Sequence, residues 1–147
     1  PAIFNEVNKV CKCKNILLTT GGTGWLHAVV RIEKKNADDG KKAIEAAFKG
    51  HGSLKHCIVV DKDIDIYSPD SIEWAIATRF QADKDAVIMP KMPGSSLDPS
   101  AEQRPGEKTK TCKVGLDATI PFGKNAKSFK KAGYEKVDLK KYLDDAL

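Results

Sequence analysis

Short apolar runs alternate with helical patterns in this chain, and that order constrains the fold more than any other feature. The apolar runs cover residues 26–32, 57–60 and 86–89, and the helical patterns lie at 39–50 and 70–80. The first run has the two-residue period of a strand, and the other two are continuously apolar, as in strands covered on both faces. A strand–helix–strand–helix–strand order predicts a parallel sheet with right-handed crossover helices.

Turn and cap residues set the expected element boundaries. Residues 16–34 are expected to form a hairpin whose GGTG sequence supplies the turn, because glycine accepts positive φ. Asp38 or Asp39 is expected to cap the first helix. Asp70 and Glu73 form a D-x-x-E variant of the capping box for the second.

A proline-rich segment, residues 90–114, interrupts this regular pattern. A loop of this length is usually functional or mobile. It follows a strand, so we expect it at the carboxyl ends of the parallel strands, where α/β sheets place ligand crevices. A short strand with the sequence KVGLDATIP follows, and Asp138 is expected to cap a final helix. Its apolar face carries Leu139, Tyr142, Leu143 and Leu147. The fold class is α/β: a small mostly parallel sheet with crossover helices, an N-terminal hairpin and a C-terminal helix.

Composition limits the protein classes. A length of 147 residues fits one domain, and no apolar run reaches the roughly 20 residues of a membrane helix. The 4 cysteines lack the spacing of a zinc site and no export signal is seen, so free thiols in a reducing cytoplasm are expected. The net charge of +5 is compatible with nucleic-acid binding, but the lysines are dispersed and few aromatic residues accompany them.

Three apparent motifs do not meet the requirements of known sites. The acidic run Asp61, Asp63 and Asp65 lacks the glycine and glutamate positions of a calcium-binding EF-hand. We therefore expect these carboxylates to bind nearby backbone N–H groups or helix dipoles. The GGTG sequence is not followed by the Lys-Ser/Thr pair and helix of a phosphate loop. The 3 histidines have no spacing typical of metal ligands.

A connected series of segments resembles one family. The sequence HCIVVDKDIDIYSPDSIEWAIATRFQADKDAVIMP is followed by PGSSLDPS and KVGLDAT, with WLHAVVRIEKK and GKKAIEAAF upstream. In this order the segments resemble the C-terminal domain of UbiD-type decarboxylases, over roughly residues 1–121. The remaining residues, 122–147, are expected to be a lysine-rich linker and C-terminal helix. The pattern is most similar to archaeal members, some of which are anhydromevalonate phosphate decarboxylases of isoprenoid synthesis.

The resemblance implies that the parent protein is a carboxy-lyase that removes CO2 from an unsaturated or aromatic acid. Prenylated FMN, with a divalent metal and potassium, would do the chemistry in the flavin-binding and split-barrel domains of that protein. No catalytic or metal-binding residue is matched here, so the chain alone is expected to bind no cofactor and to be inactive. In the family this domain mediates homo-oligomerisation and closes over the active site.

Individual residues follow from the same resemblance. A lysine after the first helix approaches the flavin phosphate in the family, which makes Lys49 and then Lys55 the candidates. The L-D-P loop places an apolar side chain over the substrate, so Ser95, Ser96 and Leu97 are the candidate substrate-binding residues. Two alternatives remain: a stand-alone assembly module without catalysis, and a nucleic-acid binder that uses the basic surface.

Overall fold

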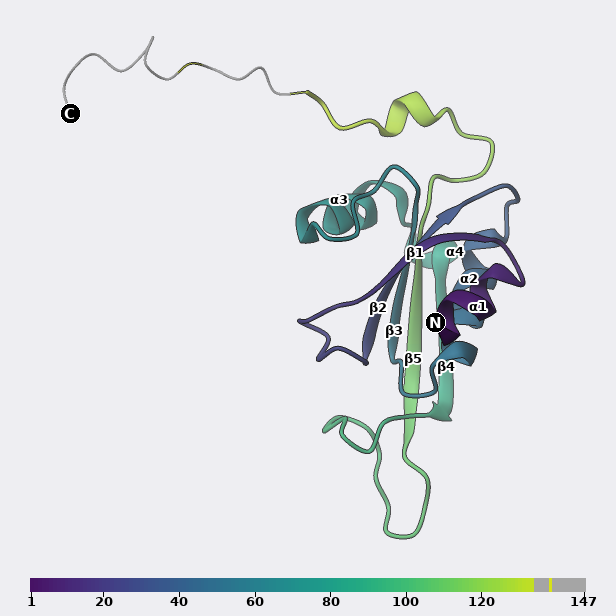
Figure 1. Cartoon of the computed structure of the whole chain (residues 1–147), viewed down its shortest axis with the longest axis vertical. Helices are drawn as coiled ribbons and strands as arrows, with labels where there is room; N and C mark the ends of the chain where they lie inside the picture. Colours follow the sequence, from purple (N-terminus) through teal and green to yellow (C-terminus); the bar gives the residue numbers. More distant parts are fainter. Residues whose placement is uncertain (134–137, 139–147) are drawn as a thin grey trace, which may run out of the picture.

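A five-stranded mixed sheet with helices on both faces forms the body of the protein (Figure 1). The computed structural model describes residues 1–133 and residue 138. The helices are α1 (Ala2–Asn8), α2 (Asp39–Gly50), α3 (Pro69–Arg79), the short α4 (Ala82–Asp85) and the 3-10 turn η1 (Ala126–Phe129). The strands are β1 (Lys12–Leu18), β2 (His27–Glu33), β3 (His56–Asp61), β4 (Ala86–Pro93) and β5 (Lys110–Ala118).

The sheet has the strand order β1-β2-β3-β5-β4. Strands β2, β3 and β5 are parallel, and β1 forms the expected hairpin with β2. The expectation that the strand at 86–89 joins the parallel set is wrong, because β4 pairs antiparallel with β5. The chain returns from β4 to β5 through a loop without a crossover helix, and such a connection pairs strands antiparallel. β4 is also an edge strand rather than a covered one, with Ile88 67 % exposed.

The period of two in the strands separates two apolar layers. Val30 and Val59 pack with Ile44 beneath α1 and α2, and Ile58 and Val60 pack on the opposite face beneath α3. Figure 1 shows these helices on the two sides of the sheet. Strand β5 comes so close to α2 that a Cβ on its glycine, residue 115, would lie 2.1 Å from the Ile44 side chain. The mostly parallel α/β architecture predicted from the sequence is confirmed.

The N-cap of helix α3 lies two residues before Asp70, the cap that the sequence pattern suggested. Ser68 is its N-cap, and the Ser68 side chain accepts a hydrogen bond from the Ser71 N–H. Pro69 occupies the first turn, where its fixed φ and missing N–H are tolerated. The expected capping box of Asp70 and Glu73 is therefore wrong, because a serine with extended backbone already supplies the cap.

Helix α2 has the expected bounds but a different role for its aspartates. Asp38 stands at the N-cap and makes no side-chain cap hydrogen bond. Asp39 is buried, and its Oδ2 accepts the Lys35 N–H at 2.7 Å and the Asn36 N–H at 2.9 Å. Its carboxylate thus fixes the entry to the helix rather than the free N–H groups of the first turn.

The irregular segment is shorter than expected, since β4 continues to Pro93 and β5 begins at Lys110. It comprises residues 94–109. Helix α1 was not anticipated, and the expected C-terminal helix lies outside the described residues. Within the described part of the chain, no helix is both long and apolar enough to cross a bilayer.

Candidate functional site

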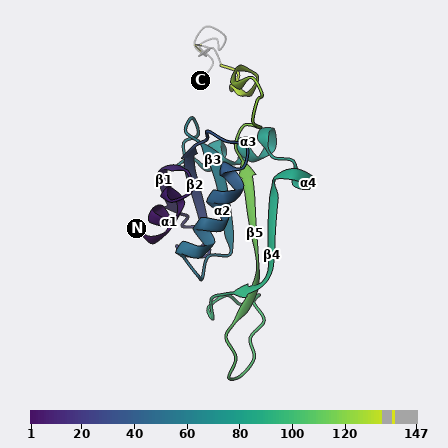
Figure 2. The same ribbon diagram turned by 90° about the vertical axis from the view of Figure 1, so that its right-hand side faces the viewer.

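The two ends of the parallel strands differ in what they carry. Figure 2 shows the segment 94–109 extending beyond β4 and β5 at the end opposite to α3. Since β4 is antiparallel, this segment lies beyond the amino ends of β3 and β5. The expectation that the loop would lie at the carboxyl ends is therefore wrong.

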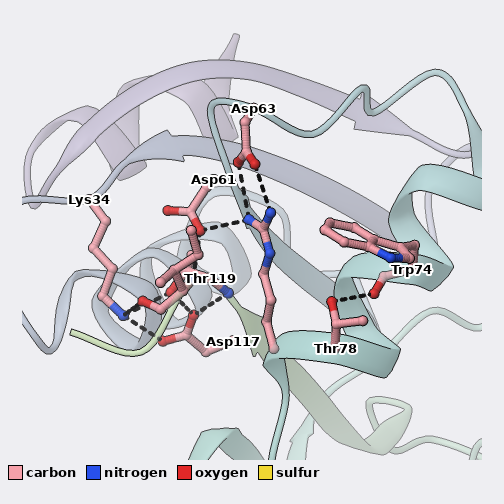
Figure 3. A network of polar contacts seen from close by, with 9 residues as sticks. Lys34, Asp61, Asp63, Trp74, Thr78, Asp117 and Thr119 are labelled. Carbon is pink, nitrogen blue, oxygen red and sulfur yellow. Dashed lines mark hydrogen bonds and ion pairs between the residues drawn. The ribbon is translucent and has the colours of Figure 1, made fainter. Parts of the chain in front are cut away.

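A buried arginine, Arg79, binds the two aspartates at the carboxyl end of β3, Asp61 and Asp63, which are labelled in Figure 3. The Arg79 side chain is 0 % exposed, and its Nη1 donates to Asp61 Oδ2 and to Asp63 Oδ1, both at 3.0 Å. Nη2 donates to Asp63 Oδ2 at 2.7 Å. The guanidinium also lies 5.2 Å from the centre of the Trp74 ring. Arg79 thereby ties the end of α3 to the end of β3.

The pKa values of the two aspartates around Arg79 are shifted in opposite directions. Burial raises the pKa of Asp61, although the Ile120 N–H, which donates to its Oδ2 at 2.6 Å, acts against this rise. The hydrogen bonds from Arg79 lower the pKa of the more exposed Asp63. As expected, Asp61 and Asp65 accept backbone N–H groups, the latter from Tyr67 at 3.0 Å. The role of Arg79 was not anticipated from the sequence.

A second polar cluster closes the carboxyl end of β5. Lys34 Nζ donates to Thr119 Oγ1 at 2.8 Å and lies 3.8 Å from Asp117 Oδ2. Asp117 Oδ1 accepts the Thr119 backbone N–H at 3.1 Å. Figure 3 shows this cluster near Asp61 and Asp63. Charges at the end of the sheet where ligands usually bind are thus paired internally.

The loop at the other end presents one apolar side chain to solvent. Leu97 is 71 % exposed, and its N–H donates to Ser95 Oγ at 3.2 Å. Ser95 is buried and its carbonyl accepts the Asp98 N–H at 3.1 Å. Gln103 Nε2 donates to the Ser96 carbonyl at 2.9 Å. The backbone around Leu97 is therefore held by local hydrogen bonds, while its side chain has no cover.

A buried ion pair anchors this loop to the sheet. Lys55 Nζ lies 2.8 Å from Asp98 Oδ2, and the Lys55 and Asp98 side chains are 19 % and 4 % exposed. Lys55 also donates to Ser100 Oγ. Asp98 Oδ1 accepts the Ser100 N–H at 3.0 Å. These interactions, the one with Lys55 foremost, lower the pKa of Asp98.

The structure brings four of the five candidate residues together and separates the fifth. Lys55 is linked through Asp98 to the loop that contains Ser95, Ser96 and Leu97. Lys49 instead ends α2, where its side chain is 73 % exposed and pairs with Glu6 Oε2 of α1 at 3.3 Å.

Two residues of this region were not singled out from the sequence, although each carries a signal. Asp98 lies inside the quoted L-D-P motif, where an aspartate next to proline favours a local turn. Lys113 occupies an inward position of β5, on the same face of the strand as Thr111 and Gly115, and is 1 % exposed. A lysine at a covered strand position indicates a specific acceptor set, because an isolated ammonium is costly to bury.

No group of three or more His, Cys, Asp or Glu side chains in residues 1–133 and 138 could hold a metal ion. The cysteines at positions 11, 13, 57 and 112 are free thiols. Burial raises the pKa of the Cys57 thiol to about 12. Cys57 is accordingly the buried small apolar residue that its apolar run predicted.

These features define a mixed α/β domain with a closed polar end and an apolar loop tip at the other end. The family described as the 3-octaprenyl-4-hydroxybenzoate carboxy-lyase C-terminal domain matches residues 2–118. The chain belongs to this family, which confirms the UbiD resemblance.

The relatives indicate where in the family the chain lies. It is 54 % identical over 133 residues to the anhydromevalonate phosphate decarboxylase of Methanocaldococcus jannaschii, covering 90 % of this chain and 31 % of that protein. Gallate decarboxylase of Lactiplantibacillus plantarum is 35 % identical over 153 residues, with 97 % and 31 % covered. The chain thus spans about a third of the length of the curated relatives it matches.

Solved structures agree with the fold. The UbiD-class enzyme HmfF of Pelotomaculum thermopropionicum, in complex with FMN, superposes with a TM-score of 0.82 at 38 % identity, covering 97 % of this chain and 32 % of that one. The 3,4-dihydroxybenzoic acid decarboxylase of Klebsiella pneumoniae gives a TM-score of 0.76 at 30 % identity, with 96 % and 30 % covered. The first is an enzyme of the UbiD class, and the second is a decarboxylase.

Proposed function

We propose that this chain is the active-site-closing domain of a UbiD-type decarboxylase that removes CO2 from an unsaturated or aromatic carboxylic acid. The observation that carries the proposal is the exposed side chain of Leu97 on a loop whose base is fixed by a buried ion pair. Burial of this leucine against an apolar surface outside the domain would be favourable, because it removes apolar area from water. We assign that surface to the substrate pocket of the flavin-binding domain.

The substrate class follows from the relatives. Those at 50–54 % identity are anhydromevalonate phosphate decarboxylases, whereas gallate decarboxylase is 35 % identical. This difference favours an unsaturated, phosphorylated acid of archaeal isoprenoid synthesis over an aromatic acid.

The proposed cofactor is prenylated FMN, since UbiD-class HmfF has been solved with FMN and, in an evolved dimeric form, with prenylated FMN. When bound, the flavin supplies the electron sink for the loss of CO2. Lys55 fits a contact with its phosphate: the ammonium has three N–H groups, and Asp98 and Ser100 engage two of them. Lys49 is the second candidate. The divalent metal and potassium belong, in this proposal, to other parts of the parent protein.

Homo-oligomerisation and a cytoplasmic location complete the proposal. An evolved form of HmfF is dimeric, and this chain exposes the large apolar side chains Phe4, Tyr67 and Ile88. The free cysteines support a reducing compartment. A stand-alone assembly module without catalysis would use the same apolar surfaces. The intact mass of the native protein separates the two, since the decarboxylase requires flavin-binding and split-barrel domains in the same protein.

Replacing Leu97 by alanine in the full-length protein tests the closing role. Burying a leucine against substrate contributes about 1.5 to 3 kcal/mol. Leu97→Ala should therefore lower kcat/KM roughly tenfold to a hundredfold. The melting temperature should stay the same, because the side chain is 71 % exposed. Val10→Ala, a second exposed apolar position, serves as the matched control and should leave both quantities unchanged. Unchanged kinetics for Leu97→Ala would refute the closing role.

A further inference from the structure

We propose that Lys113, the buried lysine of β5, is a positioning residue that sets the place of Leu97 through the turn 52–54 and the Lys55–Asp98 ion pair. The functional part of this inference rests on the closing role proposed for Leu97. The structural part, that Lys113 orders the loop, stands on the contacts below.

The first step is the unusual environment of Lys113. The residue is 1 % exposed, and its Nζ donates to the carbonyls of Gly52 and Leu54, both at 2.6 Å. The ammonium lies 5.3 Å from the centre of the Phe48 ring, and no carboxylate among residues 1–133 and 138 forms an ion pair with it. Burial lowers its pKa. A methionine would fill this space without the desolvation cost, so the donors themselves have a use.

That use is to fix the turn before β3. Two of its carbonyls converge on a single ammonium, which holds residues 52 and 54 at a set separation. The Leu54 N–H also donates to the His51 carbonyl at 3.0 Å. The next residue, Lys55, is held on both sides, because its N–H donates to Leu26 O at 2.8 Å and its carbonyl accepts the Val114 N–H at 3.0 Å. The base of the Lys55 side chain therefore has one position.

Lys55 passes this position to the loop. Its ammonium meets Asp98 Oδ2 at 2.8 Å in a site where both side chains are largely buried. A largely buried ion pair has a narrow range of favourable geometries, because only close contact offsets the desolvation of both charges. Asp98 adjoins Leu97 and orders the following turn through the Ser100 N–H. The connected contacts thus run from Lys113 through the turn to Lys55, Asp98 and Leu97.

Ordering rather than packing is what this arrangement supplies. The segment 94–109 contributes no side chain to either apolar cluster of the domain, and Leu97 remains uncovered. A loop without its own core is ordered by polar contacts, here the hydrogen bonds within the loop and the ion pair with Lys55. A rigid tip loses less conformational entropy when it closes on a ligand, which is the benefit of preorganisation.

Hydrogen exchange in the full-length protein tests the structural part. Lys113→Met keeps the apolar stem and removes both hydrogen bonds to the turn, and Asp98→Asn keeps the shape and removes the charge. Each should speed exchange of the Leu97 and Ser100 amides at least about tenfold. Lys110→Met, an exposed lysine three residues earlier on β5 with no ion pair among the described residues, is the matched control and should leave these rates unchanged. Unchanged rates in Lys113→Met overturn the inference. If this variant proves unstable, unchanged rates in Asp98→Asn overturn it instead.

A double-mutant cycle then tests whether the position reaches the chemistry. If Lys113 and Asp98 act through Leu97, each variant should lower kcat/KM about fivefold or more alone and less than twofold in the Leu97→Ala background. Fully additive losses overturn the positioning role and leave the closing role of Leu97 intact. A Leu97→Ala variant with unchanged kinetics refutes the closing role instead, and the exchange rates then decide the structural part by themselves.

Discussion

The two ends of the parallel strands use buried charge in different ways. At the carboxyl end, Arg79 and Lys34 bind carboxylates that belong to the strands themselves or to the residues just after them. At the amino end, Lys55 binds the carboxylate of Asp98 and the hydroxyl of Ser100, which lies 45 residues further along the chain in the loop. The first end joins core elements to one another, whereas the second attaches a segment that has no core.

This difference shows that the general rule about α/β sheets has to be applied strand by strand. Ligand crevices lie at the carboxyl ends of parallel strands, where helix and strand ends leave backbone groups free. Here those groups are occupied: the Ile120 N–H binds Asp61 and the Thr119 N–H binds Asp117. The antiparallel β4 carries its following loop, with the exposed Leu97, to the other end of the sheet.

The largest expected effect is at the carboxyl end. Arg79→Met should lower the free energy of unfolding of the chain by about 3 to 5 kcal/mol. The variant leaves the carboxylate of Asp61 buried without its cationic partner, and an unpaired buried charge is costly. Among the described residues, Asp61 would retain only the Ile120 N–H of its two hydrogen-bond donors. Denaturant titration measures the change.

The matched control for Arg79 is a neighbouring lysine. Lys62 lies between the same two aspartates, its side chain is 64 % exposed, and its ammonium is 3.5 Å from Glu33 Oε1. Lys62→Met should cost less than about 0.5 kcal/mol. If both variants lose similar stability, the carboxyl end is no more tightly joined than the surface, and the contrast between the two ends fails.

The sequence predicted local structure better than pairing. Helices α2 and α3 and strands β2 and β3 fall where periodicity places them, because amphipathic spacing is a property of neighbouring residues. The direction of β4 could not be predicted in this way. It depends on whether residues 94–109 form a crossover helix or a long return loop. The spacing of apolar residues within β4 does not distinguish these two connections.

The candidate site was predicted in part for a similar reason. The family resemblance selected Leu97 and Lys55, and the structure places both in one connected region. The partners that hold them, Asp98 and Lys113, come from segments separated by up to 61 residues, as in the contact of Lys113 with the Gly52 carbonyl. Such contacts leave no periodic trace. The local signals were the inward position of Lys113 in β5 and the aspartate–proline pair at Asp98.

A smaller effect should appear when the pH is lowered, and one carboxylate at each end, Asp98 and Asp61, should respond with opposite signs. The pKa of Asp98 lies below its ordinary value of 3.8, so its ionised form stabilises the folded state above that pH and the contribution is lost as the pH falls through the lowered pKa. The pKa of Asp61 lies above 3.8, so the folded state binds this proton more tightly than the unfolded chain, and acidification favours folding at this group.

Asparagine variants make this contrast measurable. Unfolding followed between pH 6 and pH 2 should show a weaker acid loss of stability in Asp98→Asn than in the parent, and a stronger one in Asp61→Asn. The same sign in both variants would show that the two carboxylates have similar surroundings, contrary to their contacts.

The smallest expected effect concerns Lys49, the candidate that the structure separates from the loop. Its side chain is 73 % exposed and its ion pair with Glu6 spans 3.3 Å, so Lys49→Met should change the free energy of unfolding by less than about 0.5 kcal/mol.

In the full-length protein, Lys49→Met should also leave the Kd for flavin within about twofold. Lys55→Met should weaken flavin binding by roughly tenfold or more, the usual range for a charge-assisted hydrogen bond to phosphate. Titration of flavin fluorescence measures both constants, and melting curves control for folding of the Lys55 variant. The reverse ranking would assign the phosphate contact to Lys49. The amino end of the sheet would then hold the loop only, and the cofactor would be met from the end of α2.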